Sequence, residues 1–195
     1  MAQAAAAMKP PAALASAKTR LLEIIKRKSL LTEGGPFKLA SGAMSDYYLD
    51  LKPTMFDPHG AALIGEIINA MLAADTDVDA IGGLELGAVP ISAAVSALSV
   101  QARPIKSFVV RKESKDHGTA KKIDGNFTPN STVVLVEDVT TRGGSVMQAV
   151  RAVRERGATV KKIITVVDRL EGARENLAKE GIALEAIFTR NDLLG

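Results

Sequence analysis

The chain has 195 residues, of which 47% are hydrophobic, and this is enough for one domain with a substantial core. It contains no cysteine, which excludes disulfides, thiol nucleophiles and thiolate metal sites. No apolar run approaches the roughly 20 residues that a membrane span requires, and the net charge of +3 is too mild to indicate nucleic-acid binding.

The N-terminal third is predicted to contain a tail, two helices and a pair of short strands. Residues 1–17 are rich in alanine, and we expect them to be a disordered tail on a cytoplasmic protein. An amphipathic helix is expected over residues 18–31, followed by short strands at 37–40 and 47–51. Asp57 is a typical N-cap with proline at the first helical position, and it predicts a helix to about residue 74.

Strands and helices alternate through the rest of the chain. Aliphatic strands are expected at residues 78–83, 107–112, 133–136, 161–167 and 182–189, and helices at 90–98, 146–156 and 172–179. This alternation predicts an α/β fold with a parallel sheet covered by helices on both faces. Ligands of such sheets bind beyond the carboxyl ends of the strands, so the informative loops are those that follow Gly83, Lys112, Asp138 and Asp168.

The most informative stretch is residues 133–145, VVLVEDVTTRGGS. Glu137 and Asp138 come where a buried strand is expected to end. A loop of mostly small residues follows: Thr140, Thr141, Arg142, Gly143, Gly144 and Ser145. The N–H groups of such a loop and the positive end of the next helix bind an anionic group, and glycine permits close approach. A P-loop lysine and a Gly-x-Gly-x-x-Gly pattern are both missing, which argues against nucleotide-triphosphate and dinucleotide sites.

This stretch resembles the 5-phosphoribosyl 1-pyrophosphate (PRPP) signature of the type I phosphoribosyltransferases. In that family the paired acids hold the ribose hydroxyls and the loop holds the 5-phosphate. The resemblance therefore assigns Glu137 and Asp138 to the ribose and residues 140–145 to the phosphate. The residue types suit these roles, because carboxylates accept hydrogen bonds from vicinal hydroxyls and a phosphate takes several N–H donors.

Two further loops resemble parts of the same family. The glycine-rich turn within residues 81–90, which includes Gly83, is similar to the loop that holds the pyrophosphate through backbone N–H groups. Residues 103–122 carry seven basic against two acidic side chains, which predicts a small polyanionic ligand. Within them, the pattern Arg-Lys-x-x-Lys-x-His-Gly resembles the mobile catalytic loop of orotate phosphoribosyltransferases. The resemblance implies that four side chains bind the pyrophosphate: Arg111, Lys112, Lys115 and His117. Among them, Lys115 is the expected main contact of the leaving group.

The base site is also assigned by resemblance. A small N-terminal hood, about residues 18–56, is expected to cover the base above a core of about 57–195. Tyr48 in the hood, Thr141 in the loop and Arg169 after the late strand are expected to contact orotate, with Arg169 at its carboxylate.

The sequence departs from the family at two positions. Relatives carry a lysine where this chain has Ala40 in the hood, and another where it has Gly87 in the glycine-rich turn. Neither lysine contact is carried over. Arg103 is then expected to join the basic loop in balancing the pyrophosphate.

The resemblance implies transfer of the phosphoribosyl group of PRPP to N1 of orotate, giving orotidine 5-monophosphate and pyrophosphate in pyrimidine biosynthesis. Lys115 and Asp138 are the expected catalytic residues. Mg²⁺ is the expected cofactor, held mainly by substrate oxygens and by Asp138 through water, with no protein metal cage. We also expect a homodimer in which the loop at 111–118 closes over the partner's site, and no nucleic-acid or membrane partner.

Two alternatives remain open. A phosphoribosyltransferase for a purine base or uracil would share the signature, although the loop at 111–118, the tyrosine pair at 47–48 and Arg169 favour orotate. A PRPP-sensing regulator would bind the ligand without catalysis. Residues 1–31 offer one helix, too little for the DNA-binding helix-turn-helix of such proteins, and the presence of Lys115 and His117 favours an enzyme.

Overall fold

The fold is built on one six-stranded sheet. A computed structural model describes residues 11–38, 44–100, 102–113 and 122–195, apart from the side chains of Pro11 and Lys38. The strand order is β10-β9-β8-β5-β6-β7. The strands span Ala80–Leu84 (β5), Lys106–Val110 (β6), Ile123–Gly125 (β7), Thr132–Thr140 (β8), Thr159–Asp168 (β9) and Leu184–Thr189 (β10). Neighbouring strands are parallel except β7, which pairs with β6 in the antiparallel direction.

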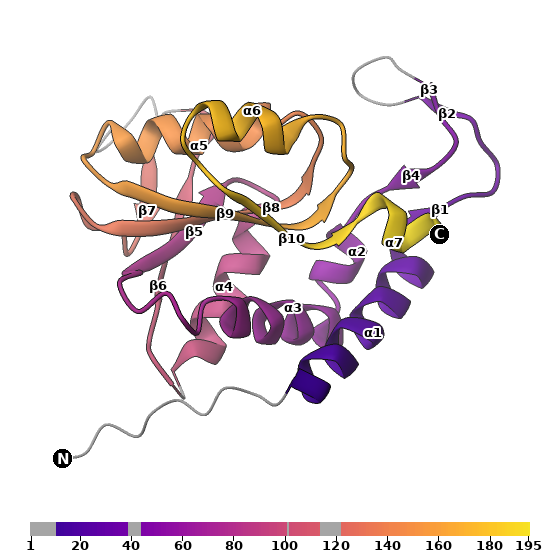
Figure 1. The fold of residues 1–195 in the computed structure, drawn as a ribbon, viewed down its shortest axis with the longest axis horizontal. Helices are drawn as coiled ribbons and strands as arrows, with labels where there is room; N and C mark the ends of the chain where they lie inside the picture. Colours follow the sequence, from indigo (N-terminus) through magenta and orange to yellow (C-terminus); the bar gives the residue numbers. More distant parts are fainter. Residues whose placement is uncertain (1–10, 39–43, 101, 114–121) are drawn as a thin grey trace.

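Helices cover both faces of the sheet, as predicted (Figure 1). One face carries α1 (Pro11–Lys28), α3 (Pro58–Met71) and α4 (Ala88–Ser99), and the other carries α5 (Gly144–Arg154) and α6 (Ala173–Lys179). Alternate residues of β8 enter two separate cores: Val134 and Val136 pack on the side of α3, while Val133 and Leu135 pack on the side of α5. Because both faces of β8 are buried, its side chains do not alternate between polar and apolar, and this explains the unbroken aliphatic run at residues 133–136.

A small hood projects from one side of the sheet, beside the C-terminal helix (Figure 1). It consists of two short antiparallel pairs, β1 (Leu30–Leu31) with β4 (Tyr48–Leu49) and β2 (Phe37–Lys38) with β3 (Met44–Ser45). The short helix α2 (Lys52–Met55) leads from the hood into the core, and α7 (Arg190–Leu194) closes the chain. Ala40 lies outside the described residues.

The first helix begins earlier than the sequence analysis predicts. Residues 11–17, expected to be part of a disordered tail, form the first turns of α1. Ala17 is 3% exposed, and Leu14 packs against the same core. The alanine-rich composition suggested low complexity, but alanine has the highest helix propensity, and Leu14, Ala17, Leu21 and Ile25 recur at helical spacing. Residues 1–10 lie outside the described residues.

Two strand predictions also need correction. Residues 121–129 gave no periodic signal, yet Ile123–Gly125 form the edge strand β7, because three residues are too few to show a period and the pairing comes from β6. Strand β8 runs on to Thr140, so Glu137 and Asp138 lie inside it rather than after it.

The β8–β9 pairing shifts between Val133, which faces Val160, and Val134, which faces Lys162, so β9 holds one extra residue there.

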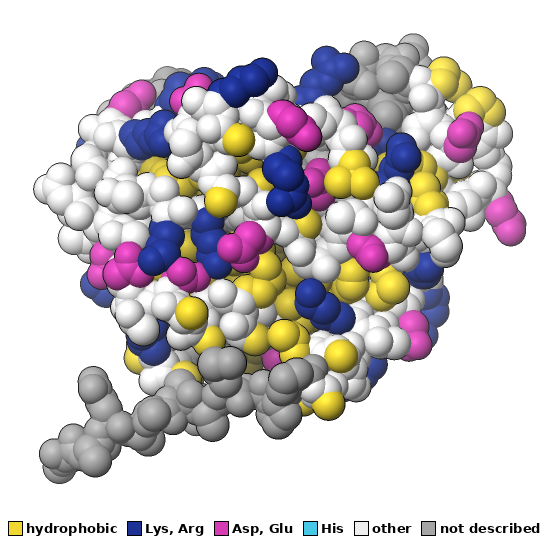
Figure 2. Space-filling model, in the orientation of Figure 1, with side chains coloured by type: hydrophobic (Ala, Val, Ile, Leu, Met, Phe, Trp, Pro, Cys, Tyr) yellow, Lys and Arg dark blue, Asp and Glu magenta, His cyan; other side chains and the backbone are white. Residues whose placement is uncertain are grey.

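The surface seen in Figure 2 mixes both signs of charge. Among the described residues on this face, Lys and Arg side chains lie interspersed with Asp and Glu side chains. No helix in the described part of the chain is both long and apolar enough to cross a membrane.

Candidate active site

The acid pair lies at the carboxyl end of the sheet, against the turn after β5. Glu137 is 7% exposed, and its Oε1 accepts a hydrogen bond of 3.3 Å from the Asp138 N–H. Asp138 Oδ1 accepts a bond of 2.8 Å from the Val139 N–H. A Cβ built on Gly87 would lie 2.7 Å from Asp138 Oδ1 and 2.8 Å from Glu137 Oε1. Both carboxylates therefore converge on one point of the turn, and in this arrangement position 87 has no room for a side chain.

The environment of Glu137 favours its protonated form. Burial raises the pKa of Glu137 to about 8, and the negative charge of Asp138 adds to the effect, while the Lys112 cation opposes it. Both effects favour the neutral carboxyl of Glu137 over its carboxylate. A hydroxyl-rich or cationic ligand would meet a carboxyl pair with both a donor and acceptors.

The loop after β8 leads into a helix whose N–H groups are free for a ligand. Gly143 is the N-cap of α5 and has φ +83°, and its cap makes no side-chain hydrogen bond. A Cβ on Gly144 would meet nothing within 4 Å, and Thr141, Arg142 and Ser145 are exposed. Thr140, by contrast, is 2% exposed. The N-terminal N–H groups of the 11-residue α5 thus open onto space beside the acid pair, as an anion site requires.

Gly83 does not lie in the turn to which the sequence analysis assigned it. It belongs to β5, where an added Cβ would collide with the Val136 carbonyl oxygen and lie 2.7 Å from Ala88 Cβ. Strand and helix packing therefore accounts for this glycine. The turn that reaches the acid pair is residues 85–87, and Gly87 is its closest member.

Glu85, which was not predicted as a site residue, links this turn to the basic segment. The Lys112 N–H donates to Glu85 Oε1 at 2.9 Å, and the Glu85 N–H donates to the Val110 carbonyl at 2.8 Å. Arg111 pairs with an acid of the edge strand, since its Nη1 lies 3.3 Å from Asp124 Oδ2 on β7. Lys115 and His117 lie outside the described residues.

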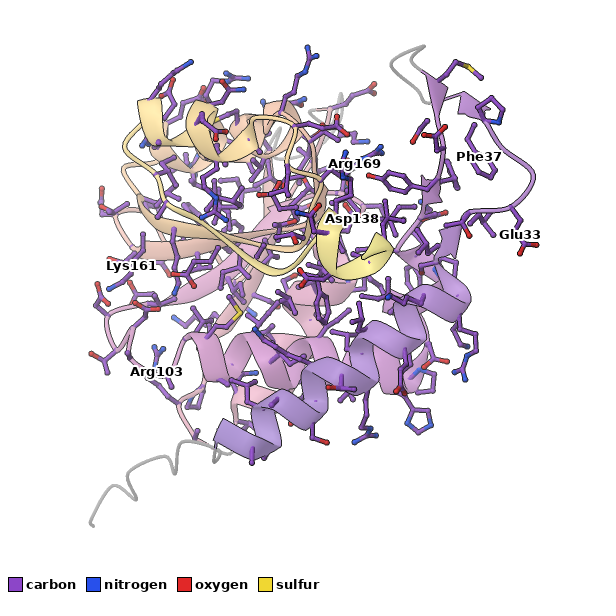
Figure 3. All side chains as sticks on the ribbon, turned by 45° about the vertical axis from the view of Figure 1, so that its right-hand side comes forward. Glu33, Phe37, Arg103, Asp138, Lys161 and Arg169 are labelled. Atoms are coloured by element: carbon purple, nitrogen blue, oxygen red, sulfur yellow. The ribbon has the colours of Figure 1, made fainter. Side chains whose placement is uncertain are left out.

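Arg103 is not near the predicted pyrophosphate site. Its Nη1 donates to the Val78 carbonyl at 2.6 Å and its Nη2 to the Asp75 carbonyl at 2.9 Å. Figure 3 shows it at the opposite side of the molecule from Asp138. Arg103 therefore secures the loop before β5, and the expectation that it balances a pyrophosphate was wrong.

Lys52, which the sequence analysis also missed, brings a cation from the hood side. Its Nζ lies 2.7 Å from Asp50 Oδ1. The bond to Asp50 raises the pKa of Lys52, and the Asp138 carboxylate contributes to the same rise. Lys52, in the first turn of α2, therefore lies within electrostatic range of Asp138.

A buried arginine closes the site toward the hood. Arg169 is 8% exposed, and its N–H donates to the Thr140 carbonyl at 2.9 Å. Its Cζ lies 4.7 Å from the centroid of the Tyr47 ring, and its Nε lies 2.9 Å from Glu171 Oε1. In the view of Figure 3, Arg169 and Asp138 both appear on the side of the sheet toward the hood, and Arg169 follows Asp168, which pairs with Thr140 on the strand of Asp138. A buried guanidinium beside an aromatic ring is a suitable receptor for a planar, anionic ligand.

Tyr47 contacts Arg169, while its neighbour Tyr48 is the residue predicted to contact orotate. Tyr48 is 40% exposed and pairs with Phe37 at 6.1 Å between ring centroids. Successive residues of a strand point to opposite faces, so only one member of the pair can face the arginine. The sequence pattern did not indicate which. The Tyr47 hydroxyl is buried and has no hydrogen-bond partner among the described residues.

A metal ion would find few protein ligands here. Among the described residues no group of three or more His, Asp and Glu side chains could hold one. The acid pair offers carboxylate oxygens from two residues, which suits Mg²⁺ bound mainly through substrate oxygens and water.

Comparisons with known proteins agree with this geometry. Residues 55–190 match the phosphoribosyl transferase domain family. The chain is 46% identical to the orotate phosphoribosyltransferase of Aquifex aeolicus over 179 residues, which are 91% of this chain and 97% of that protein. The orotate phosphoribosyltransferase of Mycobacterium tuberculosis H37Rv, solved with Fe(III) dicitrate, superposes with a TM-score of 0.80 at 37% identity, covering 92% of this chain and 99% of that one. The same enzyme solved with PRPP gives a TM-score of 0.76 at 34% identity, covering 91% and 98%.

Proposed function

Since the chain belongs to the phosphoribosyl transferase domain family and, within it, to the orotate phosphoribosyltransferases, we propose that the residues at the carboxyl end of its sheet bind PRPP and orotate. The enzyme transfers the phosphoribosyl group of PRPP to orotate, giving orotidine 5-monophosphate and pyrophosphate. One observation supports the residue assignment above all. The acid pair, the open N-terminus of α5 and the buried Arg169 all meet at one edge of the sheet.

The proposed binding roles follow from charge and position. Residues 140–145 and the first N–H groups of α5 hold the 5-phosphate, while Glu137 and Asp138 hold the ribose hydroxyls. Strand β8 pairs Thr140 with Asp168 of β9, so the phosphate loop and the turn that carries Arg169 begin side by side. A ligand held by the loop at one end therefore presents its other end to Arg169, which takes the orotate carboxylate.

The reaction needs no protein nucleophile. N1 of orotate loses its proton to water or to a pyrophosphate oxygen and forms a bond to C1 of the ribose. The bond from C1 to the pyrophosphate oxygen breaks at the same time, and that electron pair leaves with the pyrophosphate. Positive charge builds on the sugar, where the Asp138 carboxylate stabilises it, and negative charge builds on the leaving group, where Lys115, Arg111, Lys112 and His117 stabilise it. Lys52 adds a cation beside the acid pair. Asp138 would help to hold Mg²⁺ through water, and the ion would supply positive charge that offsets part of the charge on the leaving group.

The test is the loss of orotate absorbance in the presence of PRPP and Mg²⁺. We expect kcat/KM to fall at least about a hundredfold in Lys115→Ala and in Asp138→Asn, in line with the loss of a main electrostatic group. Lys179→Ala, at the exposed end of α6, is the matched control and retains full activity. Turnover within threefold of the parent in both site variants would refute the assignment of roles. Consumption of uracil in place of orotate would refute the assignment of Arg169 to a carboxylate.

We further propose a homodimer in which residues 111–118 act in the partner's site. Mixing Lys115→Ala subunits with Asp138→Asn subunits in equal amounts tests this arrangement. If the loop acts across the interface, half of the dimers are hybrids with one intact site each, and activity recovers to about a quarter of the parent value. Mixtures that stay as inactive as their components, although subunits exchange, would show that the loop acts within its own subunit.

A further inference from the structure

The buried charge of Arg169 is balanced by one neighbouring acid. Glu171 Oε1 lies 2.9 Å from Arg169 Nε, an ion pair without hydrogen-bond geometry, while the Tyr47 ring covers one face of the guanidinium at 4.7 Å. The two terminal nitrogens of Arg169 make no hydrogen bond with any residue that the structure describes, and neither of them is a fully buried atom. An arginine that is only 8% exposed requires a counter-charge, and Glu171 supplies it from an edge that leaves the terminal nitrogens available.

The turn after β9 is fixed by Asp168 at its base. Asp168 is 1% exposed, and its Oδ1 accepts the Leu170 N–H at 3.0 Å and the Thr140 hydroxyl at 3.5 Å. Leu170 has φ +59°, a left-handed conformation that a side chain such as leucine rarely adopts. The backbone of Arg169 is tied to Thr140 in turn. Because the turn is held at these points, Glu171 comes back beside the arginine that lies two residues before it.

We propose that Glu171 is a positioning residue that selects an acidic base. Its carboxylate holds the Arg169 guanidinium by the Nε edge, so that the edge formed by the two terminal nitrogens faces the carboxylate of the incoming base. A carboxylate can then take two parallel N–H bonds from that free edge, whereas a base without a carboxylate leaves the two donors unpaired. This inference rests on the proposed role of Arg169 in binding orotate.

The test is Glu171→Gln, which keeps the size of the side chain and removes its charge. We expect KM for orotate to rise about tenfold, because a guanidinium that is no longer held in place loses one of its two charge-assisted hydrogen bonds to the carboxylate of the base. KM for PRPP should change less than twofold. The ratio of kcat/KM for orotate to that for uracil should fall by about the same factor. A general loss of structure would lower kcat/KM for orotate and kcat/KM for uracil together and leave their ratio unchanged. The ratio therefore distinguishes a positioning role of Glu171 from a role in folding.

Two further variants make the outcome decisive. Glu180→Gln breaks the exposed Arg154–Glu180 pair of 3.6 Å, far from the site, and should leave both base and PRPP kinetics unchanged. Arg169→Ala should abolish the preference for orotate. If Arg169→Ala raises KM for orotate but Glu171→Gln does not, the positioning role is refuted while the proposed function stands. If Glu171→Gln binds orotate more tightly, Glu171 competes with the ligand and the inference is overturned. If Arg169→Ala leaves KM unchanged, the proposed function of Arg169 itself fails.

Discussion

Replacing Gly87 by alanine tests whether the acid pair must keep its present geometry. The added Cβ would lie 2.7 Å from Asp138 Oδ1 and 2.8 Å from Glu137 Oε1, while ordinary contacts begin near 3.4 Å. The two carboxylates would have to retreat by roughly 0.6 Å to restore normal packing distances. Because a misplacement of 1 Å can cost on the order of a hundredfold in rate, we expect kcat/KM for PRPP to fall about tenfold.

Gly83→Ala is the matched control, because its effect should fall on stability. Its Cβ would meet the Val136 carbonyl and Ala88 Cβ inside the sheet, and overpacking of this kind costs ~1–3 kcal/mol, or about 2–12 °C in Tm. Initial rates at varied PRPP, together with thermal unfolding, separate the two glycines. A Gly87→Ala enzyme with parental kcat/KM for PRPP would refute the reasoning. So would one whose Tm falls as far as that of Gly83→Ala.

Further predictions concern charge. Because the pKa of Glu137 is raised to about 8 in the folded state, its contribution favours folding at low pH and is lost as the pH rises from about 4.5 through 8. Urea unfolding at pH 6 and pH 9 should therefore show a smaller pH dependence in Glu137→Gln than in the parent, and equal dependence would contradict the assignment. Lys162→Met removes a cation that lies 2.8 Å from Asp75 and 3.0 Å from Glu185. Because both acids reach solvent, we expect a loss of ~1–2 kcal/mol, about 2–8 °C in Tm, with unchanged kcat/KM. A large loss of activity at unchanged Tm would contradict a purely structural role.

The sequence alone was enough to predict the parallel sheet and the position of its ligand edge. Long strands such as β8 and β9 are recognisable by their aliphatic runs, and helices such as α3 and α5 by their helical spacing. The glycine pair 143–144 marks the loop between β8 and α5. The four-residue α2, the five-residue α7 and the three-residue β7 were missed because segments so short show no period. Their structure depends on contacts with distant parts of the chain.

The candidate site was predicted less completely than the fold. Residues assigned to the phosphate loop and the acid pair do lie together, because one continuous strand and loop carry them. Contacts between distant segments could not be read from the sequence. Arg103 looked like an anion ligand from charge alone but binds backbone carbonyls, and the Arg111–Asp124 pair gave no sequence signal. Glu171 gave no signal, since an acid two residues from an arginine is common on any surface.

The extra residue in β9 determines which residues of β8 and β9 lie opposite one another at the carboxyl end of the sheet. Between the shift at Val133 and Val134 and the end of the strands, β8 and β9 run in register until Thr140 faces Asp168. Loss of one residue near Lys161 would slide every later pair by one and turn Arg169 to the opposite face of the sheet. The distance between the proposed phosphate loop and Arg169 therefore depends on backbone pairing that begins at the other end of these strands. Evolution toward another base is consequently easier in the hood and the turn after β9 than in the strands themselves.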